Sequence, residues 1–192
     1  NHKNTEYEFV FFDLPENQKK KVVLNFPLYQ GVKDVWVGTD NDADVFEPYP
    51  FEKNKRAVFY GTSITQGGCA CRPGMAYTNI LSRKLGIECI NLGFSGNGRG
   101  EPELARNICA IDDISLIVLD YEADALVNGL YQQTLPGFIH ILREKYQKTP
   151  ILVVSKIIFA GEILKPEERQ KRCGNLEFQK QLIKDLAEKG DL

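Results

Sequence analysis

The chain has 192 residues, of which 43% are hydrophobic and 26% are charged, a composition typical of globular proteins. Its formal net charge of −2 gives no reason to expect nucleic acid or an anionic membrane surface as a partner. No apolar run approaches the roughly 18 residues of a transmembrane helix, so membrane insertion is not expected either. The length fits one domain of moderate size plus a small part of another.

The first 50 residues have the pattern of an antiparallel β unit. Apolar runs bounded by turn residues predict strands over Tyr7–Phe12, Lys21–Phe26 and Val32–Gly38. Three such strands bury too little surface to be stable unless they pack on something. The proline-rich stretch Glu47–Phe51 is the predicted linker. We therefore expect a β-rich segment over residues 1–50 and a second domain over residues 51–192.

From Arg56 onward, strands and helices alternate. The predicted strands are Ala57–Tyr60, Glu88–Leu92, Leu116–Tyr121 and Ile151–Ser155, and the predicted helices are Met75–Leu85, Pro102–Ala110, Gln132–Tyr146 and Pro166–Lys189. Continuous apolar strands that alternate with helices indicate a parallel sheet covered on both faces. The expected fold class is α/β: a three-layer, flavodoxin-like sandwich with a parallel sheet, preceded by the small β-rich segment.

A serine follows the end of the first of these strands. Residues 58–68 read VFYGTSITQGG, so that Ser63 comes two residues after Gly61. Ligands of open α/β sheets bind at the carboxyl edge, where a serine becomes a nucleophile if a base reaches it. The stretch is not the G-x-S-x-G elbow of the α/β-hydrolases, because Thr65 stands where the second glycine belongs. It resembles the G-D-S-[IL]-T block of the SGNH (GDSL-like) hydrolases, with Thr62 in place of the usual aspartate.

A glycine-rich turn follows the next predicted strand. Residues 90–100 read INLGFSGNGRG, and a helix start with Pro102 in its first turn comes directly after them. Glycines allow backbone N–H groups to face a cavity without side chains in the way. The resemblance to the SGNH family implies that Gly96 of the Ser-Gly pair donates its N–H to the oxyanion, together with the N–H of Ser63.

The block after the third strand departs from the family pattern. Residues 116–125 read LIVLDYEADA, and the resemblance places the third oxyanion donor, an asparagine in the family, at Asp124. An ionised aspartate only accepts hydrogen bonds, so it would repel the developing negative charge. The loss of one such donor typically costs about 10²–10³ in kcat. A carboxyl group kept neutral by an apolar site would still donate.

The family's last block, D-x-x-H with the catalytic histidine and its aspartate, is not found in this chain. The two histidines are His2, near the N-terminus, and His140, which lies opposite the apolar stripe of its predicted helix. We interpret His140 as an ordinary surface residue. No general base is therefore identified, and we expect either that the sequence is truncated at its C-terminus or that the chain is not a hydrolase as it stands.

The resemblance covers about residues 56–160 and implies a serine ester hydrolase with Ser63 as nucleophile and no cofactor. Members of one subfamily carry a preceding β-sandwich domain, whose end residues 1–50 resemble. By this resemblance the protein is expected to be secreted or periplasmic. The subfamily is often linked to esterified carbohydrates, so a small-molecule or carbohydrate ester is the expected substrate. The alternative is a catalytically inactive module of the same fold that binds carbohydrate or acts as a scaffold. Asp124 and the missing histidine favour this alternative.

Other chemistry-bearing residues give weaker signals. The five cysteines form no C-x-x-C pair and no metal-ligand spacing with histidine, so no metal site is expected. Arg72 and Tyr77 follow the serine turn closely enough to reach a substrate, and Arg72 would suit a carboxylate. A solvated loop arginine and a core tyrosine are the favoured interpretations of these two residues, and neither is assigned to the site.

Overall fold

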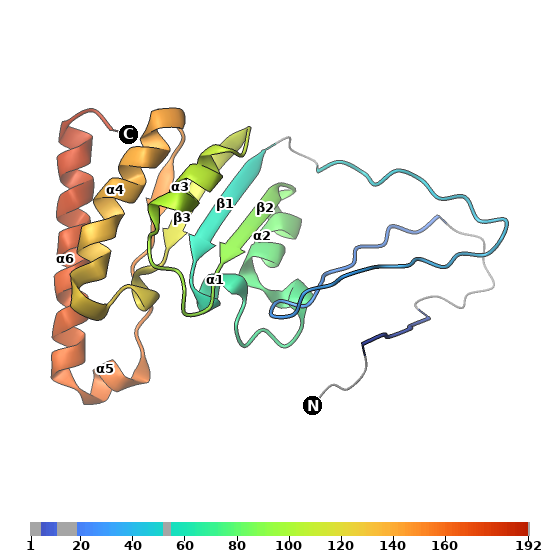
Figure 1. The fold of residues 1–192 in the computed structure, drawn as a ribbon, viewed down its shortest axis with the longest axis horizontal. Coiled ribbons are helices and arrows are strands. Elements are labelled where there is room, and N and C mark those ends of the chain that lie inside the picture. Colours follow the sequence, from blue (N-terminus) through green and yellow to red (C-terminus); the bar gives the residue numbers. More distant parts are fainter. Residues whose placement is uncertain (1–4, 11–18, 52–54, 192) are drawn as a thin grey trace.

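A computed structural model of the protein describes residues 5–10, 19–51 and 55–191. Its sheet has the strand order β2-β1-β3-β4, and every pair of neighbours is parallel (Figure 1). The strands are β1 (Arg56–Gly61), β2 (Glu88–Gly93), β3 (Ile114–Asp120) and β4 (Ile151–Val153). The central strand β1 is almost wholly buried, as its continuous apolar run predicts. The expected α/β class with a parallel sheet is confirmed.

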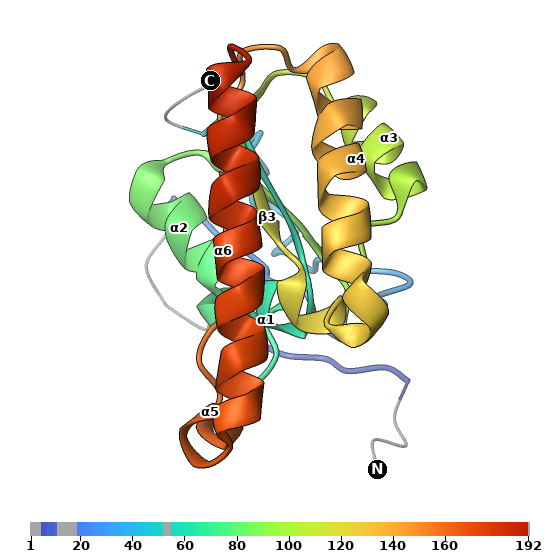
Figure 2. The same ribbon diagram turned by 90° about the vertical axis from the view of Figure 1, so that its left-hand side faces the viewer.

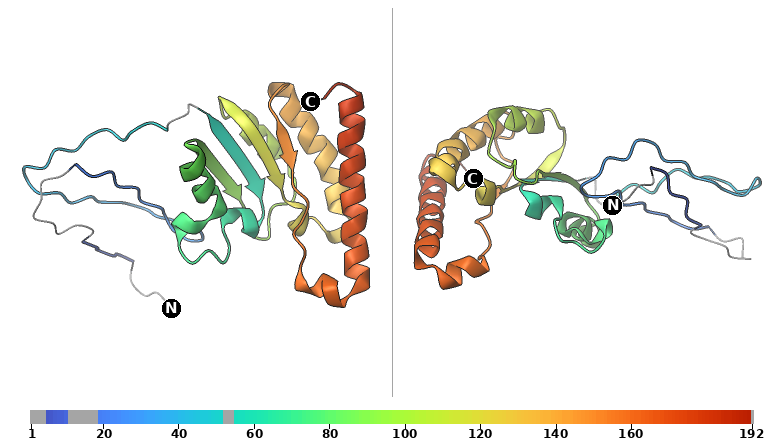
Figure 3. Two further views of the ribbon diagram at one scale, coloured as in Figure 1. Left: turned by 180° about the vertical axis from the view of Figure 1, so that it is seen from behind. Right: turned by 60° about the horizontal axis from the view of Figure 1, so that its bottom comes forward.

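Helices cover both faces of this sheet (Figure 3). The α-helices are α1 (Ser63–Gln66), α2 (Tyr77–Leu85), α3 (Pro102–Cys109), α4 (Leu130–Lys145), α5 (Ala160–Leu164) and α6 (Pro166–Glu188). Short 3-10 turns are η1 (Pro73–Met75), η2 (Glu122–Asp124) and η3 (Val127–Gly129). The long helix α6 runs beside α4 (Figure 2). None of the helices in the described part of the chain has the length and hydropathy that a bilayer crossing requires.

Alternate side chains of β1 enter two different cores. Val58 and Tyr60 belong to a large core that α3, α4 and α6 close, whereas Ala57 and Phe59 pack against residues of α2. This alternation follows from the two-residue period of a strand. The sheet is therefore the middle layer of three, with its carboxyl edge left open to the loops that carry the predicted site.

The strands expected before residue 50 are not formed. Residues 19–51 contain no strand, and neither do residues 5–10; the rest of the stretch Tyr7–Phe12 lies outside the described residues. Apolar side chains stay exposed there, with Trp36 at 90% and Val37 at 83%. The segment extends away from the sheet beyond β2 and α2 (Figures 1 and 3), so no second layer covers its apolar side chains. Its interpretation as the end of a β-sandwich domain stays a prediction.

Candidate active site

The three predicted blocks leave the sheet at the same edge. Ser63 begins α1 directly after β1, Gly96 lies in the loop after β2, and Asp124 ends the η2 turn after β3. Because the strands are parallel, their carboxyl ends meet along one side of the sheet. The structure thus brings all three residues to the edge where open α/β sheets bind their ligands.

The turn that carries Ser63 is fixed by its own backbone. Thr62 caps α1, with its hydroxyl oxygen accepting a hydrogen bond from Ile64 N at 3.3 Å. The helix ends after one turn because Gly67 adopts a left-handed conformation with φ of 106°. Gly67 N and Gly68 N then both donate to the Ser63 carbonyl oxygen, at 3.1 and 2.7 Å. Ser63 itself is half-buried.

The hydroxyl and the N–H of Ser63 differ from its carbonyl oxygen, which accepts the hydrogen bonds just described. Within the described residues, neither the Ser63 hydroxyl nor the Ser63 N–H has a hydrogen-bond partner. Gly61, at the end of β1, lets the turn lie close to β3, since a Cβ there would come within 2.5 Å of the Asp120 carbonyl oxygen. A side chain at Gly61 would therefore displace the turn.

The loop from Gly93 to Gly100 leaves a single N–H without an acceptor. Phe94 N donates to Gly61 O at 2.9 Å, and Ser95 N donates to Gln66 Oε1 at 2.9 Å. The other N–H groups of the loop are bonded to Asn91, Phe94, Asp124, Glu101 and Tyr60. Only the Gly96 N–H has no partner within the described chain, and Gly96 holds a φ of 70°. This is the N–H that the resemblance assigned to the oxyanion.

Asp124 is engaged as an acceptor. Its Oδ2 accepts a hydrogen bond from Gly98 N at 3.2 Å. Gly98 also packs directly on the end of β1, because an added Cβ would lie 2.6 Å from Gly61 O. Asp124 therefore holds the glycine loop close to the end of β1, next to the turn that carries Ser63.

The sequence profile of the GDSL-like lipase/acylhydrolase family matches residues 54–191. The chain belongs to this family. Its match covers the whole α/β part, so the recognition made from the serine and glycine blocks is confirmed. No curated protein sequence matches the chain.

Solved structures support the family assignment and show the same fold in other proteins. A GDSL-like lipase candidate from Bacteroides ovatus ATCC 8483 is 33% identical with a TM-score of 0.67; the match covers 79% of this chain and 44% of that one. The chain therefore spans less than half the length of this relative. Two further structures share the fold only. The salicylyl-acyltransferase SsfX3 from a tetracycline biosynthetic pathway is 22% identical with a TM-score of 0.60, and the match covers 75% of this chain and 42% of that one. A family two carbohydrate esterase from Clostridium thermocellum in complex with cellohexaose is 16% identical with a TM-score of 0.53, and the match covers 77% of this chain and 54% of that one.

Histidine is not found at the site edge of this GDSL-like chain. His140 is the one histidine among the described residues, and its side chain is 80% exposed on α4, 4.0 Å from Glu144. The interpretation of His140 as a surface residue is confirmed. His2 lies outside the described residues. Within its described residues, the structure thus places no histidine near Ser63.

A polar network behind the serine was not found by sequence reasoning. Thr65 Oγ1, in α1, donates to Asp120 Oδ2 at 3.3 Å and accepts from the Tyr77 hydroxyl at 3.3 Å. Burial raises the pKa of Asp120 to about 6, with the Thr65 hydrogen bond opposing the shift and the charge of Glu122 adding to it. Tyr77 is used here for packing and for this network, in line with the core interpretation. The sequence feature that could have indicated this network is Asp120, a carboxylate at the end of a buried strand.

Buried charged side chains hold the loops on the β4 side of the same edge. These residues too were not found by sequence reasoning. Glu122, fully buried in η2, accepts hydrogen bonds from Lys156 N at 2.7 Å and from Asn175 Nδ2 at 3.1 Å. The Lys156 ammonium pairs with Glu162, which also accepts from Arg172 Nε at 2.6 Å. These contacts tie the turn that carries Asp124 to the segment after β4 and to α6.

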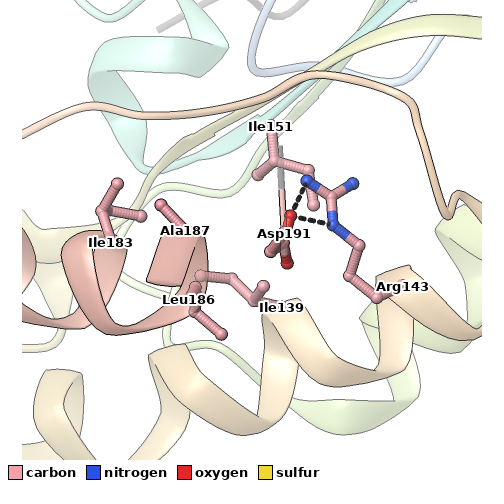
Figure 4. Close-up of a pocket in the computed structure, with 7 residues that line it drawn as sticks. All are labelled: Ile139, Arg143, Ile151, Ile183, Leu186, Ala187 and Asp191. Carbon is pink, nitrogen blue, oxygen red and sulfur yellow. Dashed lines mark hydrogen bonds and ion pairs between the residues drawn. The ribbon is translucent and has the colours of Figure 1, made fainter. Parts of the chain in front are cut away.

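Two cavities differ in their relation to the site. The larger, about 320 Å³, lies between residues 27–30 and 67–73, directly beside the serine turn. The smaller, about 60 Å³, lies where α4, α6 and the amino end of β4 meet, around the ion pair of Arg143 with Asp191 at 2.7 Å (Figure 4). The amino end of β4 is the edge opposite Ser63, so we interpret the smaller cavity as a packing feature.

Proposed function

We propose that the chain is the nucleophile-bearing part of an SGNH-type serine esterase that cleaves a small-molecule or carbohydrate ester. Ser63 Oγ attacks the ester carbonyl carbon while a base takes its proton. The tetrahedral intermediate collapses, the alcohol leaves with a proton, and water then hydrolyses the acyl-serine. The base is proposed to be a histidine outside these 192 residues, oriented by an aspartate three residues before it.

One observation carries this proposal. The N–H groups of Ser63 and Gly96 have no acceptor in the described chain, although the other N–H groups of the glycine loop are all bonded. Two N–H donors without a protein acceptor, one on Ser63 and one in the glycine loop at the same edge of the sheet, are the kind of donors that an oxyanion requires.

The proposal is tested on the natural chain that contains these residues, at its full length. Hydrolysis of 4-nitrophenyl acetate is expected to fall at least about 10³-fold in Ser63→Ala, because the acyl-serine can no longer form. Ser95→Ala is the matched control, a neighbouring exposed serine of the same edge, and is expected to keep its rate within about twofold. Unchanged hydrolysis in Ser63→Ala would refute the proposal. The 192-residue form is expected to be nearly inactive, since it lacks the base.

A second function, an inactive module that binds carbohydrate or acts as a scaffold, is favoured by Asp124. Its Oδ2 accepts a hydrogen bond from Gly98 N, and an ionised aspartate at this position would oppose an oxyanion. In Asp124→Asn the amide oxygen keeps the Gly98 contact and the amide nitrogen adds a donor. If the enzyme proposal holds, the full-length variant gains up to about 10² in kcat at neutral pH. If both forms hydrolyse no faster than Ser63→Ala, the binding module is the better account.

A further inference from the structure

The larger cavity is shared by two distant parts of the chain. Residues 27–30 form one wall and the loop 67–73 forms the other. The cavity wall is mostly apolar, with Pro27, Leu28, Ala70 and Pro73 among its residues. Its volume of about 320 Å³ matches the lower end of the range for small-molecule sites.

The cavity is linked directly to both segments of the predicted oxyanion site. Gln66 Nε2 donates to the Leu28 carbonyl oxygen at 2.8 Å, while Gln66 Oε1 accepts from Ser95 N at 2.9 Å. The loop itself starts at Gly67, whose N–H bonds to the Ser63 carbonyl oxygen. A group that fills the cavity therefore lies beside the turn that carries Ser63.

One cation stands in this apolar wall. Arg72 is exposed at the cavity and forms no ion pair within the described residues. No aspartate or glutamate is among the residues that line the cavity. A guanidinium presents several donors in a planar fork that matches a carboxylate.

We propose that this cavity binds a ring-sized group that carries a carboxylate, as one side of the ester substrate, with Arg72 holding the carboxylate. The apolar residues contact the faces of the ring, and the ester bond then lies toward Ser63. This inference rests on the proposed function, because it names the substrate class of the same site. Arg72 is assigned a role in binding and specificity and none in the bond-breaking step.

Binding tests the inference without any need for catalysis. The 192-residue chain is titrated with 4-hydroxybenzoate and with the neutral isostere 4-hydroxybenzamide, by calorimetry. We expect the carboxylate to bind at least about fivefold more tightly, with the difference shrinking as salt is added. Arg72→Gln is expected to remove the preference and Arg72→Lys to keep part of it. Arg169→Gln, an exposed arginine on α6, is the matched control and is expected to keep all of it.

The outcomes separate this inference from the proposed function. Equal binding of the two rings, no binding of either, or a preference that survives in Arg72→Gln would overturn the cavity assignment, even if Ser63→Ala abolishes hydrolysis. A preference that depends on Arg72 and persists in Ser63→Ala supports the assignment, even if no ester is hydrolysed. In the full-length chain, faster cleavage of 4-acetoxybenzoate than of 4-acetoxybenzamide places the carboxylate on the alcohol side. A preference for monomethyl terephthalate over its amide places it on the acyl side.

Discussion

The serine turn after β1 and the segment after β4 lie at the same edge of one sheet, yet different interactions hold them. The serine turn and the glycine loop are joined by hydrogen bonds between neutral groups, Phe94 N to Gly61 O and Ser95 N to Gln66 Oε1, both at 2.9 Å. On the β4 side, Glu162 is bonded to the cations Lys156 and Arg172. The pKa values of the carboxyl groups on the two sides shift in opposite directions. The pKa of Asp120 rises to about 6, and the pKa of Glu162 falls to about 2.

The difference shows what decides the charge of a buried carboxylate. Asp120 loses solvation and gains a single neutral hydroxyl, from Thr65, so its charged form is disfavoured. For Glu162 the hydrogen bond from Lys156 outweighs the loss of solvation, helped by Phe159 N and Arg172. The surroundings of Asp120 on the site side therefore disfavour its charged form, while the β4 side uses fixed charges to anchor loops. Three experiments test this contrast.

The largest effect is expected on the β4 side, from Glu122→Ala. The substitution leaves Lys156 N and Asn175 Nδ2 without their acceptor in a fully buried place, so the free energy of unfolding should fall by about 3 kcal/mol. Urea unfolding followed by circular dichroism measures it. Glu177→Ala, which removes an exposed pair with Lys180, should cost about 0.5 kcal/mol or less. Equal losses in the two variants would mean that the buried carboxylate does not anchor the η2 turn.

A smaller effect is expected from pH on the site side. Because the pKa of Asp120 is raised in the folded state, protonation favours folding, and its contribution is lost as pH rises from about 4 to about 6. The free energy of unfolding of the wild type, relative to that of Asp120→Asn, should drop by about 2 kcal/mol over this range. Asp34→Asn, at an exposed position, serves as the control. Parallel pH curves for wild type and Asp120→Asn would contradict the assignment.

Glu162 should give the opposite sign at lower pH. Its folded pKa of about 2 lies below the ordinary value, so its stabilisation is present above about pH 4.5 and is lost as pH falls toward 2. Together, the contributions of Asp120 and Glu162 to the free energy of unfolding should be largest at a pH between the transition of Glu162 and that of Asp120. This acid branch is measured by following the free energy of unfolding of the wild type itself from about pH 4.5 down to about pH 2, below the range used for Asp120.

The smallest effect distinguishes two glycines of one loop. An alanine Cβ at Gly98 would meet Gly61 O at 2.6 Å, whereas a Cβ at Gly96 meets nothing within 4 Å and adds only the strain of a φ of 70°. Both variants keep their N–H. Gly98→Ala should therefore cost about 1 kcal/mol more than Gly96→Ala in urea unfolding, and it should lower esterase activity further in the full-length chain. The reverse order would mean that the loop does not rest on β1.

The sequence predicted the parts of the fold that local patterns determine. Continuous apolar runs identified the four strands of the sheet, and their parallel order placed Ser63, Gly96 and Asp124 at one edge. The early strands, such as Val32–Gly38, were predicted wrongly because a strand pattern needs a second layer to pack on, and the described chain supplies none. The contact of Glu122 with Lys156 joins residues 34 positions apart, so no local pattern could reveal it.

The exposure of Trp36 has a practical consequence. The chain has one tryptophan, and it lies in the segment over residues 19–51, 90% exposed and outside both cores. Its fluorescence should already be that of a solvated indole in the native protein, and it should change little when the sheet unfolds. The same residue is an intrinsic optical reporter for its own segment: any partner or domain that covers residues 19–51 would shift its emission to the blue without disturbing the helices.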